Sequence, residues 1–253
     1  MHPVLLQAGP LKLHGYGFMF ALGGVLVGWW LWRRRANIGV KTADDFFLLF
    51  NVVLLSAMVT GKLLYVLEYT RFGTPQMWRT LVSPSSGFSF FGGFLGTVAA
   101  MWWYTRRKGT DFWVLADHAF WMIPAWHVPG RVGCLLAGCC FGRPTDLPWA
   151  VTFTDPAAMV PRRLLGVPLH PTQLYEALAE GLIALALYPL LKKKPGSVTA
   201  GYFMSYGVLR YFLENYRGDG VPAGWFSAGQ LLGMGLFGAG AMVLWYTRCI
   251  RRS

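Results

Sequence analysis

The sequence has little charge, and acidic residues are its scarcest part. Only 13% of its 253 residues are charged, with 11 Asp or Glu against 23 Lys or Arg. A soluble domain usually carries about 25% charged residues. Because 55% of the chain is hydrophobic and its apolar residues form long runs, the shortage of charge argues against a soluble domain. It indicates an integral membrane protein.

The sequence also lacks the features of a signal peptide and of a nucleic-acid-binding protein. No basic segment precedes the first apolar run and no cleavage-like sequence follows it, so we predict a retained membrane span rather than a signal peptide. The basic residues, which give a net charge of +12, gather in short clusters at the ends of apolar runs. That distribution is typical of membrane topology, so no nucleic-acid partner is predicted.

Seven apolar segments approach the roughly 20 residues that a helix needs to cross the hydrocarbon core of a bilayer. They cover residues 14–32, 46–67, 88–105, 112–129, 172–191, 198–216 and 225–247. Four basic clusters follow the first, third, fifth and seventh segments and hold 12 of the 23 Lys and Arg. They lie at residues 33–35, 106–108, 192–194 and 248–252. With seven spans all four clusters fall on one side, which the positive-inside rule makes the cytoplasm.

The predicted fold is therefore an all-α polytopic membrane protein with seven transmembrane helices. Its N-terminus is periplasmic, its C-terminus is cytoplasmic, and residues 1–253 form a single membrane-embedded domain. Residues 130–171, between the fourth and fifth helices, are long for a link between adjacent helices. We expect them to form a folded periplasmic element. Gly92 and Gly96 form a small-xxx-small pattern, which predicts close packing of the third helix.

The stretch from Pro129 to Pro144 is unlike a plain membrane helix. It contains two arginines, Arg131 and Arg143, together with three of the four cysteines and four glycines. Glycine lets the backbone approach a bulky partner closely. Arginine presents a planar fork that suits phosphate. We interpret this stretch as a polar site for a lipid headgroup, with the other segments forming its wall.

Two predicted spans carry a stripe of polar side chains, which is costly in a membrane and by default marks a functional site. At 100° per residue each stripe occupies one helix face. The stripes hold Arg210, Glu214 and Arg217 in the sixth span, and Gln173, Glu176 and Glu180 in the fifth, with His170 just outside it. Two such stripes suggest a polar cavity between helices. A structural ion-pair network that fixes helix packing is the alternative, and the two can coexist.

The cysteines Cys134, Cys139 and Cys140 lie within seven residues. Zinc sites usually repeat such a pair or add histidines, and the sequence has no second pair, so no metal site is predicted. In an oxidising compartment a disulfide from Cys134 to Cys139 or Cys140 is one possibility. Buried, inert thiols are another. A nucleophilic thiolate, favoured by Arg131 and Arg143, is the third.

Several motifs in a fixed order point to one family. They are HGYG at 14–17, SFFGG at 89–93, GRVG at 130–133 with GR at 142–143, HPTQLYE at 170–176, and RYFLENYR at 210–217. With these motifs the chain resembles the prolipoprotein diacylglyceryl transferase family along nearly its whole length. That family has seven spans with the N-terminus outside, in the bacterial inner membrane.

The resemblance implies a transferase reaction. The sn-1,2-diacylglyceryl group of phosphatidylglycerol passes to the thiol of the lipobox cysteine in the signal peptide of a preprolipoprotein, and glycerol-1-phosphate leaves. The implied partners are these two substrates and the lipid bilayer. No cofactor, metal or nucleotide is implied.

The resemblance also implies roles for individual residues. Arg131 and Arg210 match the family's essential arginines and are assigned to the phosphate. Glu214 is expected to orient Arg210, Tyr16 to position the headgroup or the thiol, and His170 to be a candidate proton acceptor. The residues expected to bind substrate are Arg131, Gly142, Arg143, Gln173, Glu176 and Arg217.

The sequence departs from the family at three positions. Phe91 stands where the family has a histidine that is often proposed as a base. Cys134 and Cys139 stand where it usually has Asn and Glu. Either that histidine is dispensable or another group, such as His14 or His170, accepts the proton. The alternative functions are a related acyl or glyceryl transferase with another acceptor, and a non-catalytic lipid-binding protein on the same scaffold.

Overall fold

The computed structural model describes residues 3–9, 11–83, 86–220 and 222–250. Its contacts divide the chain into two compact units. The larger unit contains Met1–Leu31 and Asp117–Ser253, and the smaller contains Trp32–Ala116. Arg251 and Arg252, from the last predicted basic cluster, lie outside the described residues.

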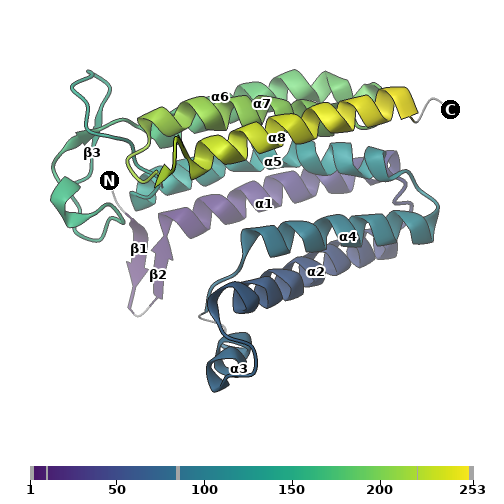
Figure 1. Cartoon of the computed structure of the whole chain (residues 1–253), viewed down its shortest axis with the longest axis horizontal. Helices are drawn as coiled ribbons and strands as arrows, with labels where there is room; N and C mark the ends of the chain where they lie inside the picture. Colours follow the sequence, from purple (N-terminus) through teal and green to yellow (C-terminus); the bar gives the residue numbers. More distant parts are fainter. Residues whose placement is uncertain (1–2, 10, 84–85, 221, 251–253) are drawn as a thin grey trace. The chain divides into compact units, whose positions relative to one another are not determined.

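The larger unit is built mainly of long helices (Figure 1). An N-terminal hairpin of β1 (Val4–Ala8) and β2 (Leu11–His14) leads into α1 (Gly15–Arg34). The other long helices are α5 (Phe112–Ala137), α6 (Thr172–Leu187), α7 (Ser197–Leu213) and α8 (Ala228–Trp245). Short 3-10 turns extend α6 and α7, over Tyr188–Lys192 and Glu214–Tyr216.

Small residues set the packing of these helices. A Cβ at Gly207 of α7 would overlap the backbone of Gly233 in α8, and a Cβ at Gly23 of α1 would overlap the side chain of Trp126 in α5. Such residues let helix backbones approach closely where the hydrophobic effect does not drive helices together. At the start of α8, Ser227 and Gln230 form a capping box that satisfies two backbone N–H groups.

The smaller unit is a pair of long helices with a short one between them. It contains α2 (Ala43–Tyr69), α3 (Pro75–Val82) and α4 (Phe90–Lys108). The close packing predicted for Gly92 and Gly96 is confirmed, because a Cβ at either glycine would overlap α2. Thr60 and Ser56 of α2 donate hydrogen bonds to the carbonyls of these glycines, at 2.7 and 2.9 Å.

All seven predicted segments lie on helices, namely α1, α2, α4, α5, α6, α7 and α8. By length and apolar composition, four helices in the described residues are able to cross a membrane. They are Gly15–Ile38, Ala43–Tyr69, Thr172–Lys192 and Ala228–Cys249. The chain is thus mostly helical and has the helices of a membrane protein. The number of crossings and the side of each terminus stay predictions.

The end predicted for the fourth segment is wrong. The prediction stopped at Pro129, but α5 remains helical through Pro124 and Pro129 and ends at Ala137. A proline removes one backbone hydrogen bond and tends to kink or break a helix, yet here the helix continues for two more turns. Gly138, with φ of 76°, then ends it in the left-handed conformation. Arg131 and Cys134 therefore lie on a helix and not in the loop.

The helical fold class is confirmed, and a few short strands add to it. Beside the helices the described residues form three two-stranded antiparallel sheets. The second sheet joins β3 (Val151–Thr152) to β4 (Pro168–Leu169), and the third joins β5 (Pro222–Ala223) to β6 (Phe226–Ser227). Strands of two residues are too short to show an alternation of polar and apolar side chains in the sequence. The segment after α5 is folded around a small core of its own, made by Phe141, Phe153, Val160 and Leu169.

Candidate functional site

Two guanidinium groups from separate segments meet at one buried carboxylate. Glu176 lies on α6, and its side chain is 1% exposed. Its Oε1 is 2.6 Å from Nη2 of Arg131, which is on the last turns of α5. Its Oε2 is 3.8 Å from Nη1 of Arg217, which follows α7. Glu176 and the two arginines thus join three parts of the chain that the sequence places up to 86 residues apart (217 − 131 = 86).

The position of Arg217 is held from both sides. Asp219 accepts two hydrogen bonds from its guanidinium, at 2.9 and 2.7 Å. Such bidentate pairs fix the plane of the arginine fork. Nε of Arg143 donates to the carbonyl of Arg217 at 3.1 Å, and the backbone of Gly142 bridges to Arg217. Arg143, expected from the sequence to bind substrate, is thus seen here supporting the backbone of Arg217.

A second ion pair continues the site along α7. Nη2 of Arg210 is 2.8 Å from Oε2 of Glu214, so the carboxylate orients the guanidinium. Nη1 of Arg210 is buried and has no hydrogen-bond partner among the described residues. Tyr206, one turn earlier on α7, donates to Oε1 of Glu176 at 3.4 Å and lies within electrostatic range of both Arg131 and Arg210. The phenol thus lies near both arginines that the sequence singled out.

The cysteine turn lies directly beside Arg131. Nη1 of Arg131 is 3.4 Å from Sγ of Cys140, and the sulfurs of Cys134, Cys139 and Cys140 all lie within 4.8 Å of one another. All four cysteines of the chain are unbridged. Hydrogen bonds from the other two thiols, and then the neighbouring Arg217, lower the pKa of the Cys140 thiol. Hydrogen bonds with the other two thiols raise the pKa of the Cys139 thiol, so a thiolate in this turn is favoured at Cys140.

The backbone of the cysteine turn is held by the first residues of α6. Gln173 donates to the carbonyl of Cys139 at 2.7 Å, and Thr172 donates to the carbonyl of Cys140 at 2.7 Å. Cys140 has a φ of 56°, a left-handed conformation that costs a residue with a Cβ roughly 1–2 kcal/mol. Oε1 of Gln173 is buried without a hydrogen-bond partner among the described residues. The turn is thus rigid and strained.

The remaining predicted residues border this cluster. Tyr16, at the start of α1, is 44% exposed and lies within electrostatic range of Arg131 and the three cysteines. Nδ1 of His170 is 3.3 Å from the hydroxyl of Tyr175, and the His170 carbonyl accepts from the N–H of Gly142 at 3.1 Å. A Cβ at Gly142 would overlap that carbonyl.

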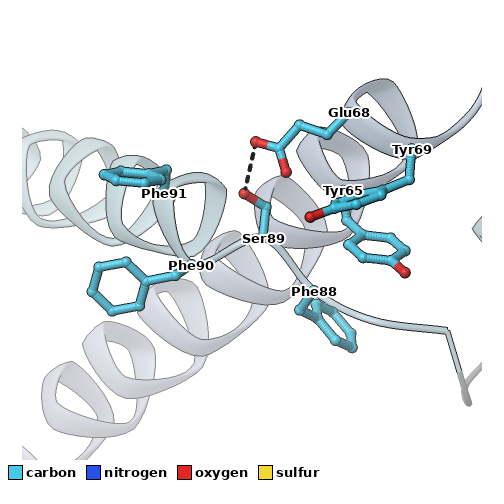
Figure 2. Close-up of a pocket in the computed structure, with 7 residues that line it drawn as sticks. All are labelled: Tyr65, Glu68, Tyr69, Phe88, Ser89, Phe90 and Phe91. Atoms are coloured by element: carbon cyan, nitrogen blue, oxygen red, sulfur yellow. Dashed lines mark hydrogen bonds between the residues drawn. The ribbon is translucent and has the colours of Figure 1, made fainter. Parts of the chain in front are cut away.

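Phe91 belongs to the smaller unit, where it borders a cavity of about 390 Å³. The cavity is lined by Tyr65, Glu68, Tyr69, Phe88, Ser89, Phe90 and Phe91. Figure 2 shows Glu68 turned toward Ser89, whose hydroxyl donates to the carboxylate at 3.1 Å. Phe91 offers no proton acceptor to this cavity.

A second cavity, of about 370 Å³, lies in the larger unit between α7 and α8. Its lining is almost wholly apolar and includes Val208, Tyr211, Phe212, Met234 and Phe237. These α7 residues flank Arg210 in the sequence, so an apolar groove begins close to the second ion pair.

Several polar residues that the structure brings together were not predicted from the sequence. Nδ1 of His127 on α5 is 2.6 Å from Oε1 of the buried Glu180 on α6. Asp117 of α5 accepts hydrogen bonds from the first turn of α7. Asp117 and His127 are ionisable residues inside the fourth predicted span. An ionisable residue in a membrane segment is by default a candidate for a functional site, so the sequence carried a signal for both.

A family model and several known proteins resemble this chain over nearly its whole length. The family model described as prolipoprotein diacylglyceryl transferase matches residues 3–246. The chain is 34% identical to a protein of Solidesulfovibrio magneticus, over 92% of this chain and 89% of the other. It is 36% identical to one of Photobacterium profundum (96% and 92%) and 35% identical to one of Bordetella avium (99% and 96%). Each of these relatives is named phosphatidylglycerol–prolipoprotein diacylglyceryl transferase.

Proposed function

The chain belongs to the prolipoprotein diacylglyceryl transferase family, and we propose that it transfers the diacylglyceryl group of phosphatidylglycerol to a prolipoprotein. The acceptor is the thiol of the lipobox cysteine. The observation that carries this proposal is the meeting of Arg131 and Arg217 at Glu176, beside the turn that ends α5.

The reaction needs a charge-stabilising site and a thiolate. The thiolate attacks the sn-3 carbon of the glycerol that carries the two acyl chains. A C–S bond forms, the bond from that carbon to the phosphate oxygen breaks, and its electron pair leaves with glycerol-1-phosphate. Preorganised guanidinium groups stabilise the charge that develops on the leaving phosphate.

The geometry supports a division of labour among the basic residues. Arg131 and Arg210 contact the phosphate, and the unpaired Nη1 of Arg210 is the donor available for it. Glu214 orients Arg210, and Glu176 holds Arg131 and Arg217 at a fixed separation. These contacts are those of a carboxylate that positions arginines for an anion.

The other site residues act on the remainder of the substrates. Tyr16 positions the headgroup or the incoming thiol at the open side of the cluster. Gly142, Arg143 and Gln173 shape the wall of the headgroup site. His170 is the candidate proton acceptor. The apolar groove between α7 and α8 receives part of an acyl chain, because it starts beside Arg210.

We place the protein in the bacterial inner membrane with seven spans, a periplasmic N-terminus and a cytoplasmic C-terminus. The four basic clusters support this topology, since seven crossings bring all of them to the cytoplasmic side. The folded segment after α5 and the site beside it are then periplasmic. There they meet the outer leaflet and the signal peptide of an exported substrate.

The proposed activity is tested with purified protein in nanodiscs that contain phosphatidylglycerol labelled in its headgroup glycerol. We expect a peptide with a lipobox cysteine to gain a diacylglyceryl thioether, detected by mass spectrometry, and labelled glycerol phosphate to appear in equal amount. The same peptide with serine at the acceptor position is the control. Absence of both products with the cysteine peptide would exclude the transferase and favour a lipid-binding protein.

Gly142→Ala tests the packing of the headgroup wall. The added methyl group pushes against the carbonyl of His170, so the bridge from Gly142 to Arg217 has to shift. Misplacing substrate-positioning groups by a fraction of an ångström is expected to lower the transfer rate by about tenfold. Gly235→Ala in α8, where an added Cβ meets nothing within 4 Å, is the control. Equal rates for the two variants would remove Gly142 from the site.

A further inference from the structure

The three cysteines at the end of α5 have the arrangement of a metal-binding set. Their sulfurs lie within 4.8 Å of one another. With a Zn–S distance of about 2.3 Å, the sulfurs of a tetrahedral zinc site are roughly 3.8 Å apart. Closing the cluster around a metal therefore takes side-chain shifts of about 1 Å or less.

The surroundings of the cluster suit a bound zinc ion. Gln173 and Thr172 hold the carbonyls of Cys139 and Cys140, so two of the three ligands sit on a fixed backbone. Arg131 lies 3.4 Å from Sγ of Cys140, and Arg217 interacts with the same sulfur. Three thiolates exceed the charge of one zinc ion by a single negative charge. The two guanidinium groups are also paired with Glu176 and Asp219, but they lie close enough to the sulfurs to stabilise this charge.

The cluster also leaves room for a fourth ligand. Cys134 is buried, whereas Cys139 and Cys140 are partly exposed, so a metal held by all three is reachable from outside. Catalytic zinc sites have three protein ligands and an open position, while structural sites have four. The missing second cysteine pair argued against a metal in the sequence, but a site with an open fourth position needs no second pair.

The proposed reaction supplies a ligand for that position. Its acceptor is a thiol that must lose a proton, and the carboxylates of the cluster are already engaged with arginines: Glu176 with Arg131 and Arg217, and Glu214 with Arg210. A thiol that coordinates zinc is deprotonated by the metal. Zinc ligation would thus do the work of a base.

We propose that Cys134, Cys139 and Cys140 bind one Zn²⁺ ion, and that the acceptor thiol takes its fourth position as a thiolate. The second part rests on the proposed transferase function. On coordination the thiol releases its proton, for which His170 is the candidate acceptor, and its sulfur then attacks the glycerol carbon of the lipid as described above. The metal changes no oxidation state in this step.

Metal binding is measured on the full-length protein, purified in detergent with a tag that contains no histidine. We expect about one zinc ion per chain, measured by inductively coupled plasma mass spectrometry. Replacing Cys134, Cys139 or Cys140 with serine should raise the dissociation constant for zinc by more than about 100-fold, because loss of a merely supporting residue already costs 10- to 100-fold. Cys249→Ser is the matched control and should keep its zinc. Equal zinc in the triple serine variant, or a disulfide among the three cysteines, would overturn the site.

Cobalt tests the fourth position without relying on activity. Co²⁺ in the cluster should show thiolate-to-cobalt charge-transfer absorption, which the triple serine variant lacks. Adding the lipobox peptide should change the cobalt bands, and adding its serine counterpart should not. An unchanged spectrum with the cysteine peptide would reject ligation of the acceptor.

The two proposals fail in different ways. Full transfer by zinc-free protein and by the triple serine variant would refute the role of zinc while the transferase stands. Zinc binding with no thioether product would refute the transferase while the metal site stands.

Discussion

Replacing Arg131 with alanine is expected to slow diacylglyceryl transfer by about tenfold to more than a hundredfold. A charge-assisted hydrogen bond is worth about 1.5–3 kcal/mol, and each 1.36 kcal/mol corresponds to about tenfold in rate. Arg131→Lys keeps the charge but loses the planar fork that makes two parallel hydrogen bonds. Its transfer rate should therefore lie between the rates of Arg131→Ala and of the natural protein. The rate of thioether formation at saturating lipid measures the effect.

The main competing explanation for such a loss is structural. Without Arg131, the buried Glu176 keeps, among the residues that the structure describes, Arg217 at 3.8 Å and the hydroxyl of Tyr206 at 3.4 Å. Removing one partner of a buried ion pair leaves a costly charge. The double variant Arg131→Ala/Glu176→Gln removes that charge as well. If the guanidinium acts on the phosphate, the double variant stays slow even though its thermal stability recovers.

Recovery of transfer in the double variant would instead make Arg131 a structural partner of Glu176. Arg162→Ala is the control for a general loss of positive charge, since Arg162 is an exposed residue of the folded segment that follows α5. It should transfer at the natural rate. A fully active, folded Arg131→Ala protein would contradict the assignment of this arginine to the phosphate.

The length of the apolar runs was enough to locate the seven long helices, because each run is about as long as a membrane span and ends in charge, glycine or proline. It failed at Pro129. There the sequence shows a helix breaker, but α5 continues to Ala137, and Arg131 on its last turns pairs with Glu176 of α6. The two-residue strands were out of reach, since two residues are too few to show an alternation of polar and apolar side chains.

The sequence predicted which residues form the site better than it predicted which of them contact each other. The stripe on the sixth predicted span correctly suggested the pair of Arg210 and Glu214, which are one turn apart. The meeting of Arg131 with Glu176 could not be read from spacing, because the two residues come from different helices. The same holds for the sulfurs of Cys134 and Cys140, which the left-handed turn after α5 brings together.

Replacing Asp117 with alanine is expected to lower the free energy of unfolding by about 3–5 kcal/mol. Asp117 is 4% exposed and accepts three hydrogen bonds, from the N–H of Gly196 and from the N–H and hydroxyl of Thr199, each at 2.8 Å. It thereby caps the first turn of α7 from a neighbouring helix, where negative charge also complements the helix dipole. Alanine would leave buried backbone donors unsatisfied. The melting temperature, followed by the fluorescence of the 12 tryptophans, measures the loss.

Two further variants divide this effect into its parts. Thr199→Val removes only the hydroxyl donor and should cost about 1 kcal/mol. Asp155→Ala removes a carboxylate that caps a surface turn through the N–H of Ala157, and it should cost less than Asp117→Ala because water replaces the lost acceptor.

An ionisable residue in a predicted span is by default a functional candidate. Since all the hydrogen bonds of Asp117 go to the start of α7, its role is structural, and the transfer rate per folded molecule should stay unchanged in Asp117→Ala. A stable but slow Asp117→Ala protein would reverse that conclusion and place Asp117 in the reaction.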